Sequence, residues 1–195
     1  RATRTRALGA IPLKSTPASS LSEDEAVALV ADHLAARGLG DLGWGKEASS
    51  LRERMRVLHD VLGNPWPDVS DEALACSAHE WLLPWAKRLA QGGSLSNVSM
   101  LDALRSMLPW PDAARLDELA PEKMPIPAGG TRPIDWSGAH PVLTLRVQQA
   151  FGWTDTPRLV DGRVPLVLHL TDPAGRPAAV TSDLTSFWAG PYRDV

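Results

Sequence analysis

Several common features of protein sequences are missing from this chain of 195 residues. Its single cysteine, Cys76, excludes a disulfide within the chain. No nearby pattern offers a base to activate the thiol, so we expect a small buried side chain. No apolar run of about 18 residues occurs and no signal-peptide pattern opens the chain. We therefore expect a cytoplasmic protein that neither spans nor crosses a membrane.

The five histidines show no spacing typical of a metal site, because no H-E-x-x-H pattern occurs and no cysteines accompany them. His169 lies in an apolar stretch, with Asp172 and Asp183 near it in sequence. A strand histidine bonded to a carboxylate is usually structural, and no nucleophile with a partner accompanies this one. We predict no metal ligand and no catalytic residue.

The phosphate-binding loop of a nucleoside-triphosphatase motor is also missing. Such a motor needs a G-x-x-x-x-G-K-[ST] sequence to hold phosphates, and the chain has none. Residues 24–27 (DEAV) and 71–74 (DEAL) are similar to a D-E-A-H motif, but neither ends in histidine. Both fall in the first turn of an expected helix, where the helix dipole stabilises acidic side chains. We expect no ATP hydrolysis by this chain.

Charge is unevenly distributed along the sequence. Residues 1–14 hold four basic and no acidic side chains, residues 15–122 hold nine basic and 17 acidic ones, and residues 123–195 hold seven basic and six acidic ones. Phosphate binding is dominated by charge neutralisation, so the middle of the chain would repel a nucleic acid. Any nucleic-acid contact is expected near the two ends.

The pattern of apolar residues predicts an α+β protein with three parts: residues 1–14, 15–122 and 123–195. Residues 4–13 read as one strand, and residues 14–21 as a linker by composition. Residues 15–122 read as an acidic helical bundle of about five helices. The expected helices begin near Ser22, Glu47, Ser70, Val98 and Pro111.

Two details of the helical part are specific enough to test. Ser22 and Glu25 have the spacing of a capping box, and Pro84 should kink or divide the third helix because it lacks an N–H. The loop at residues 64–68 (NPWPD) places Trp66 between two prolines. We expect this ring to pack back onto the helices rather than to bind a ligand.

Residues 123–195 read as a small α+β unit with β-hairpins and a C-terminal helix. A first hairpin is expected at residues 124–136, with its prolines at a sheet edge. Residues 142–151 fit either a strand or a helix, and we favour a helix begun by Pro141. Asp161-Gly162 is a strong hairpin signal, and a further hairpin is expected at residues 164–181. Ser182 or Asp183 then caps a short helix that carries Leu184, Phe187 and Trp188.

Residues 156–188 (TPRLVDGRVPLVLHLTDPAGRPAAVTSDLTSFW) carry the densest pattern in the chain. Their TPR, GRVPL, HL, PAGRP, VT and DL..FW elements resemble the C-terminal region of the bacterial HrpB family, which are DEAH/RHA-type ATP-dependent RNA helicases. The resemblance extends to residues 108–112 (LPWPD), 116–121 (LDELAP) and 141–152, and more loosely to the N-terminus. Since the sequence starts at Arg1 rather than Met, we expect it to be part of a longer protein.

The resemblance implies a non-catalytic C-terminal accessory region that shapes or gates the nucleic-acid channel of a helicase motor. Full-length members hydrolyse ATP, so ATP and magnesium are expected in the motor domains, and no cofactor is expected in this chain. The implied partners are those motor domains and RNA or another single-stranded nucleic acid, bound weakly through C-terminal arginines. The resemblance also implies that residues 1–14 are the last strand of an OB-like domain. The alternative is a protein-interaction module, in which the acidic helices or a tryptophan-lined surface dock a partner.

Four arginines are the candidate nucleic-acid contacts: Arg146, Arg158, Arg163 and Arg176. Arg158, Arg163 and Arg176 match the family pattern residue for residue, and guanidinium groups beside turns fit phosphate oxygens well. The competing interpretation is structural pairing with neighbouring aspartates.

Three tryptophans near the C-terminus are candidates for stacking on a base if they are exposed: Trp136, Trp153 and Trp188. The other tryptophans are expected to lie mostly in the core.

Overall fold

The computed structural model describes residues 3–8, 11–17 and 21–190. Two compact units divide the chain: a helical unit of residues 1–51 and 68–108, and a sheet unit of residues 52–67 and 109–195. These units join residues that are distant in sequence. The boundaries of these units therefore differ from those of the predicted domains, residues 1–14, 15–122 and 123–195. That division into domains stays a prediction.

The N-terminal segment forms a β-hairpin rather than the single expected strand. β1 (Thr3–Leu8) pairs antiparallel with β2 (Ile11–Pro17), with a register shift between Arg6 and Ala7. The single-strand interpretation ran through Gly9, a residue type that favours turns over strand interiors. β2 also takes up part of the expected linker. Residues 18–20 of that linker lie outside the described residues, and membership of an OB-like domain stays a prediction.

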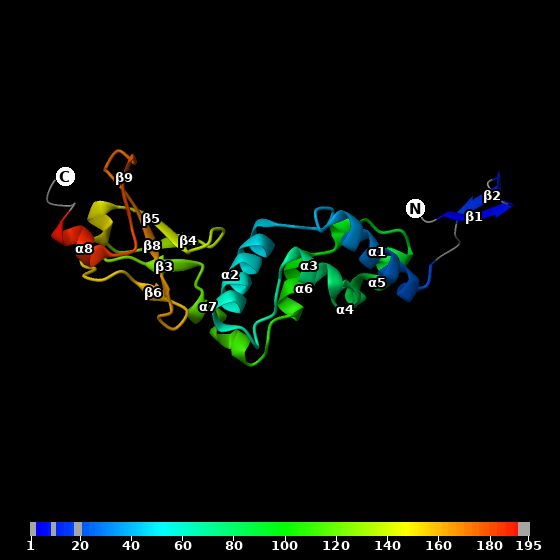
Figure 1. The fold of residues 1–195 in the computed structure, drawn as a ribbon, viewed down its shortest axis with the longest axis horizontal. Helices are drawn as coiled ribbons and strands as arrows, with labels where there is room; N and C mark the ends of the chain where they lie inside the picture. Colours follow the sequence, from blue (N-terminus) through cyan, green and yellow to red (C-terminus); the bar gives the residue numbers. More distant parts are fainter. Residues whose placement is uncertain (1–2, 9–10, 18–20, 191–195) are drawn as a thin grey trace. The chain divides into compact units, whose positions relative to one another are not determined.

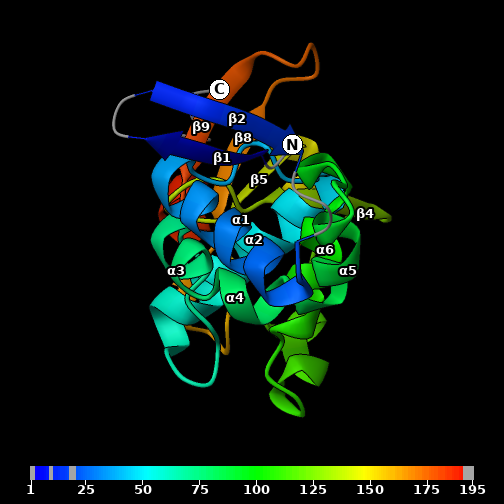
Figure 2. The same cartoon turned by 90° about the vertical axis from the view of Figure 1, so that its right-hand side faces the viewer.

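Helix α1 (Glu23–Arg37) begins with the predicted capping box. The Ser22 Oγ accepts the Glu25 N–H at 3.2 Å, and the Glu25 carboxylate accepts the Ser22 N–H at 2.9 Å. The helix ends at Gly38, where φ is +80° and favours glycine. α1 packs against α3 (Asp71–Cys76), α4 (Ala78–Trp81) and α5 (Ala86–Ala90), as Figure 2 shows.

Pro84 divides the third predicted helix, as expected. It lies in the 3-10 turn η1 (Leu83–Trp85), between α4 and α5. A second break separates α3 from α4 at Ser77. The expectation for Cys76 was wrong, because its side chain is exposed. Leu74 and Ala78 are the buried positions here, and Cys76 falls between them on the other side of the short helices.

The other helices lie near their predicted places. They are α2 (Lys46–Leu62), η2 (Leu95–Asn97), α6 (Met100–Ser106), η3 (Asp112–Arg115) and α7 (Leu116–Leu119). Trp66, in the loop after α2, is 3% exposed, which confirms that its ring is buried. No helix in the described part of the chain is long and apolar enough to cross a membrane.

A five-stranded mixed sheet organises the sheet unit, in the order β3-β4-β5-β8-β9 (Figure 1). Its strands are β3 (Lys123–Pro125), β4 (Thr131–Asp135), β5 (Val142–Arg146), β8 (Val167–Thr171) and β9 (Pro177–Thr181). β3 and β4 form the predicted hairpin at one edge. β5 and β8 are parallel, and the remaining neighbours are antiparallel. The α+β class is confirmed.

The helix favoured at residues 142–151 was wrong. Residues Val142–Arg146 are the central strand β5, and only Val147–Ala150 form a short 3-10 turn, η4. Leu143 and Leu145 are buried while Thr144 and Arg146 are exposed, which is the period-two alternation of a strand. Hydrogen bonding to β4 on one side and β8 on the other favours the strand over the helix for these residues.

The last predicted hairpins and helix are present. β6 (Arg158–Leu159) pairs with β7 (Val164–Pro165), and β8 pairs with β9. α8 (Leu184–Ala189) is capped at its N-terminus by Asp183, whose Oδ1 accepts the Ser186 N–H at 3.0 Å. Leu184 and Phe187 are buried and Trp188 is half-buried.

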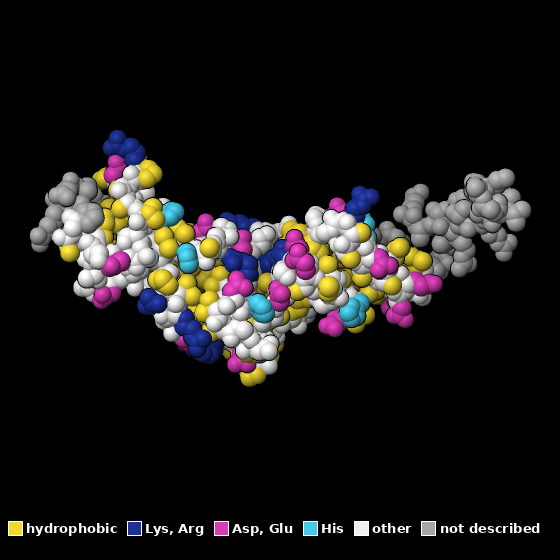
Figure 3. All heavy atoms as spheres, in the orientation of Figure 1, with side chains coloured by type: hydrophobic (Ala, Val, Ile, Leu, Met, Phe, Trp, Pro, Cys, Tyr) yellow, Lys and Arg dark blue, Asp and Glu magenta, His cyan; other side chains and the backbone are white. Residues whose placement is uncertain are grey.

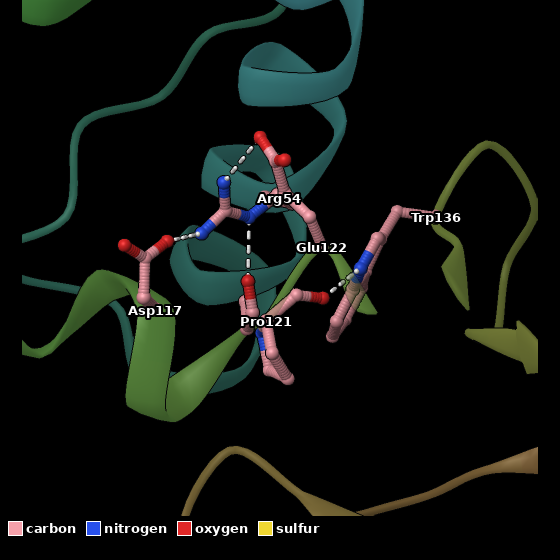
Figure 4. A network of polar contacts seen from close by, with 6 residues as sticks. Arg54, Asp117, Pro121, Glu122 and Trp136 are labelled. Atoms are coloured by element: carbon pink, nitrogen blue, oxygen red, sulfur yellow. Dashed lines mark hydrogen bonds and ion pairs between the residues drawn. The ribbon is translucent and has the colours of Figure 1, made fainter. Parts of the chain in front are cut away.

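The Arg54 side chain, on α2, is the one buried charged side chain in the described part of the chain, at 3% exposed. Its Nε donates to the Ala120 carbonyl, Nη1 donates to the Glu122 carboxylate at 3.2 Å, and Nη2 donates to the Asp117 carboxylate (Figure 4). These acceptors lie on or just after α7. A buried guanidinium is stable only when its charge and N–H groups are satisfied, so this network fixes α7 to α2.

The same α2–β3 region also holds the buried Trp136. Its Nε1 donates to the Pro121 carbonyl at 2.9 Å, one residue after the Ala120 carbonyl that Arg54 binds (Figure 4). Arg56, two residues after Arg54 on α2, donates to the Trp136 and Gly138 carbonyls at 3.0 and 2.7 Å. The start of β3 and the end of β4 are therefore both tied to α2.

Replacing Arg54 by alanine is expected to lower the free energy of unfolding by about 3 kcal/mol, because the Ala120 carbonyl loses its donor and two carboxylates lose their cation. For a chain of this size that corresponds to a fall in Tm of roughly 6–12 °C. The free energy of unfolding of Arg54→Lys should lie between those of wild type and Arg54→Ala, since an ammonium keeps the charge but cannot make all three hydrogen bonds.

Arg105→Ala, at an exposed position of α6, serves as the matched control and should change the free energy of unfolding by no more than about 0.5 kcal/mol. Calorimetric or urea unfolding measures both variants. If Arg54→Ala were as mild as Arg105→Ala, the network would not hold the unit together.

Candidate nucleic-acid interface

The turn between β6 and β7, residues 160–163, carries the most unusual backbone of the sheet unit. Three successive residues have positive φ: Val160 at +52°, Asp161 at +53° and Gly162 at +75°. This region suits glycine and tolerates aspartate, but it is strained for a β-branched valine. Strain of this kind persists only where surrounding contacts enforce it, and it concentrates at functional sites.

Contacts from α7 hold the turn. The Val160 N–H donates to the Leu119 carbonyl at 2.9 Å, and the Val160 side chain is 1% exposed. Arg115, at the end of η3, donates from Nη2 to Asp161 Oδ1 at 2.7 Å and to Glu118 Oε1 at 3.0 Å. Hydrogen bonds from Arg115 hold the pKa of the Glu118 carboxyl below its ordinary value, and Glu118 and Asp161 raise the pKa of the Arg115 guanidinium.

Arg158, one of the predicted contacts, braces the turn from within. Its Nε donates to the Gly162 carbonyl at 2.6 Å, and its Nη2 donates to the Arg163 carbonyl at 3.3 Å. Arg158 therefore does not form the alternative ion pair with Asp155 or Asp161. Its side chain is exposed, and the acceptors of its hydrogen bonds are neutral carbonyls rather than carboxylates.

Arg163 is the predicted contact with the freest guanidinium. It is exposed, and no carboxylate or carbonyl of the described residues accepts a hydrogen bond from its side chain. Figure 3 shows Lys and Arg side chains gathered on the surface where Figure 1 labels β6. Arg115, Arg158 and Arg163 thus surround one turn, which we call the basic turn. An exposed guanidinium on a rigid turn is a suitable phosphate ligand.

The other two predicted contacts lie elsewhere, at the end of the sheet where β5 and β8 finish. Arg146 is the last residue of β5 and is in register with Thr171, just before the β8–β9 turn that carries Arg176. Arg176 Nε donates to Asp172 Oδ2 at 2.8 Å, so its expected structural pairing with an aspartate is present. Backbone and side-chain hydrogen bonds from Arg176 lower the pKa of the Asp172 carboxyl. The structure therefore separates the four arginines into two pairs.

The predicted base-stacking tryptophans are not equally available. Trp136 is 1% exposed, which excludes stacking. Trp188 is half-buried, donates from Nε1 to the Trp153 carbonyl at 2.9 Å, and has its ring 5.8 Å from that of Phe151. Trp153 is also half-buried. Trp188 and its contacts fasten α8 to the chain before β6.

His169 lies on the exposed face of the sheet, in register with Thr144 and Val180. The Ser137 hydroxyl and N–H, and the charge of His169, lower the pKa of the Asp135 carboxyl. Burial and the nearby Asp135 raise the pKa of the Glu53 carboxyl. No group of three or more His, Cys, Asp or Glu side chains among the described residues could hold a metal ion.

Sequence reasoning missed Arg54 and Arg115. A lone arginine on an amphipathic helix gives no sign that it will be buried, and the acceptors of Arg54 lie more than 60 residues away. Arg115 was detectable in part, because Arg115 and Glu118 have the spacing of a helical ion pair. Its bond to Asp161 depends on tertiary structure.

Comparison with known proteins gives one consistent result. The model of the family described as "ATP-dependent helicase C-terminal" matches residues 81–195. The "ATP-dependent RNA helicase HrpB" of Escherichia coli (strain K12) is 36% identical over 197 residues, which cover 100% of this chain and 24% of that protein.

Two solved structures are similar over the whole chain at 35% identity. The crystal structure of the E. coli DExH-box NTPase HrpB has a TM-score of 0.80 and is covered to 24% of its length. That of the Escherichia coli DEAH/RHA helicase HrpB has a TM-score of 0.77 and is covered to 25%. The chain spans about a quarter of the length of the relatives that it matches.

Arg158→Gln is expected to loosen the basic turn without unfolding the protein. It removes the donors to the Gly162 and Arg163 carbonyls, so the Arg163 amide, which donates to the Val160 carbonyl at 3.1 Å, should exchange with solvent about fivefold faster. Amide hydrogen exchange followed by NMR measures this rate. Arg176→Gln, which removes a similar contact at another turn, should leave the Arg163 amide unchanged. Equal exchange in wild type and Arg158→Gln would show that Arg158 does not brace the turn.

Proposed function

Because the chain belongs to the HrpB family of ATP-dependent helicases, we propose that it is a non-catalytic C-terminal accessory region of an ATP-dependent RNA helicase. In this proposal the sheet unit shapes or gates the nucleic-acid channel of the motor domains, which are its natural partners. Single-stranded RNA is the nucleic acid that its arginines contact.

The observation that carries the proposal is the basic turn. Two arginines that match the family pattern, Arg158 and Arg163, meet there on a backbone held rigid by Arg115 and α7. Phosphate contacts from rigid elements cost little ordering entropy on binding. Arg146 and Arg176 form a second, weaker candidate, because Asp172 already neutralises part of the charge of Arg176.

The distribution of charge supports the same assignment. Residues 21–51 and 68–108 of the helical unit carry five basic and 11 acidic side chains. A polyanion is repelled by these residues, whereas the sheet unit is nearly balanced in charge and groups basic side chains at one turn. Residues 21–51 and 68–108 are therefore assigned to spacing or protein contact, and the sheet unit to RNA.

ATP and magnesium belong to the motor domains in this proposal. The sequence holds no G-x-x-x-x-G-K-[ST] loop, and no group of three or more His, Cys, Asp or Glu among the described residues could hold a metal ion. No catalytic step is assigned to the chain.

The purified chain is accordingly expected to hydrolyse ATP at the background rate, with or without RNA. A phosphate-release assay with an intact DEAH/RHA helicase as the positive control measures this. RNA-stimulated hydrolysis by the chain, retained after a further purification step, would contradict the non-catalytic assignment.

Arg163→Gln gives the cleanest test of RNA contact, because the Arg163 side chain braces nothing. We expect weak binding, with a Kd of about 10⁻⁴ M at physiological salt. Losing one phosphate contact should reduce the slope of log K against log salt by about 0.7 for a single strand. Titrations of labelled single-stranded RNA between about 50 and 200 mM salt measure the slope.

Arg105→Gln removes an equal charge from the acidic helical unit and should leave the slope unchanged. If wild type and Arg163→Gln have the same slope, the hypothesis that RNA contacts the basic turn is wrong. A protein-interaction role for the chain would then be the better account.

A further inference from the structure

A four-residue sequence occurs twice in the chain, and its two tryptophans have opposite environments. Residues 65–68 and 109–112 both read Pro-Trp-Pro-Asp. Trp66 is 3% exposed, whereas Trp110 is 71% exposed. Identical flanking residues therefore do not force the ring outward. Leaving an indole in water forgoes the favourable burial that Trp66 obtains, so the exposure of Trp110 needs an explanation.

Short, regular structure connects Trp110 to Arg115, which contacts the basic turn. The Ala113 N–H donates to the Pro109 carbonyl at 2.9 Å, and the Ala114 N–H donates to the Pro111 carbonyl at 3.0 Å, so the loop leads directly into η3. η3 ends at Arg115, which binds Asp161 in the turn. Arg115 lies five positions after Trp110 in the sequence, so their Cα atoms are at most about 18 Å apart.

We propose that Trp110 stacks on a base of single-stranded RNA whose phosphates are bound by the basic turn. This inference rests on the proposed function and names a further contact within it. An exposed aromatic ring beside cationic side chains is the arrangement by which proteins bind single strands without sequence preference. The two flanking prolines restrict the backbone, so little freedom is lost when the ring engages a base.

The charges around Trp110 favour a nucleic acid over an apolar protein segment. Arg158 and Arg163 present exposed guanidinium groups at the turn, while Asp161 and Glu118 are occupied by Arg115. Asp112, two residues after Trp110, is the exposed carboxylate nearest to the ring in sequence. Phosphates along the strand would meet cations while a base meets the indole. An apolar protein segment would use the ring but leave these cations without partners.

NMR of the isotope-labelled chain tests the proposal, because each tryptophan contributes one indole N–H signal. The Trp110 signal is identified as the one missing from the spectrum of Trp110→Phe. Adding a single-stranded oligouridylate should shift the Trp110 indole and the Arg163 amide, and leave the buried Trp66 indole in place. The same sugar–phosphate backbone without bases should shift the Arg163 amide only.

Affinity measured in the same titrations separates stacking from general apolar contact. Trp110→Ala is expected to weaken RNA binding about tenfold, within the range for losing one stacked base. Trp110→Phe should keep most of the affinity because it retains an aromatic face, whereas Trp110→Leu should behave like alanine. The exposed ring makes few internal contacts, so all three variants should melt within a few degrees of wild type.

The possible failures are distinguishable. If RNA shifts the Arg163 amide but not the Trp110 indole, and Trp110→Ala binds as wild type does, the stacking inference is overturned while the proposed function stands. If Trp110→Leu binds RNA as well as wild type, the ring acts as an apolar contact and the inference is again overturned. If RNA shifts no signal at all, the stacking inference and the proposed RNA contact fall together.

Discussion

The buried guanidinium of Arg54 is the constraint on which the candidate interface depends. Three acceptors surround it, and all of them belong to or follow α7. Because a buried charge tolerates little displacement, α7 is fixed to α2. α7 in turn receives the Val160 N–H at the Leu119 carbonyl, and Arg115 at its start binds Asp161. A core interaction thus determines where the exposed arginines of the basic turn point.

Local signals in the sequence predicted much of the fold, and long-range pairing explains what they missed. The capping box at Ser22, the break at Pro84 and the Asp161-Gly162 turn are formed by neighbours in sequence, and all three are present. Residues 142–151 fit two periods equally well, and the parallel pairing of β5 with β8 decided for a strand. That pairing joins segments about 25 residues apart, which no local pattern encodes.

Two arginines of the candidate site were predictable from the sequence, but its geometry and its other members were not. Arg158 and Arg163 could be named from their pattern, yet the sequence could not show that one braces the turn while the other is free. Arg176 looked equivalent to them but is paired with Asp172. Trp110 was overlooked because its flanking residues are those of the buried Trp66, and only tertiary structure distinguishes their environments.

Photochemical cross-linking tests the central claim, that the sheet unit is the RNA-facing part of the chain, most directly. The chain is irradiated with a single-stranded RNA that carries 4-thiouridine, and the cross-linked peptides are located by mass spectrometry. The account predicts cross-links in the peptides that contain residues 109–115 and 158–163. Cross-links confined to residues 21–51 and 68–108 of the acidic helical unit would contradict it.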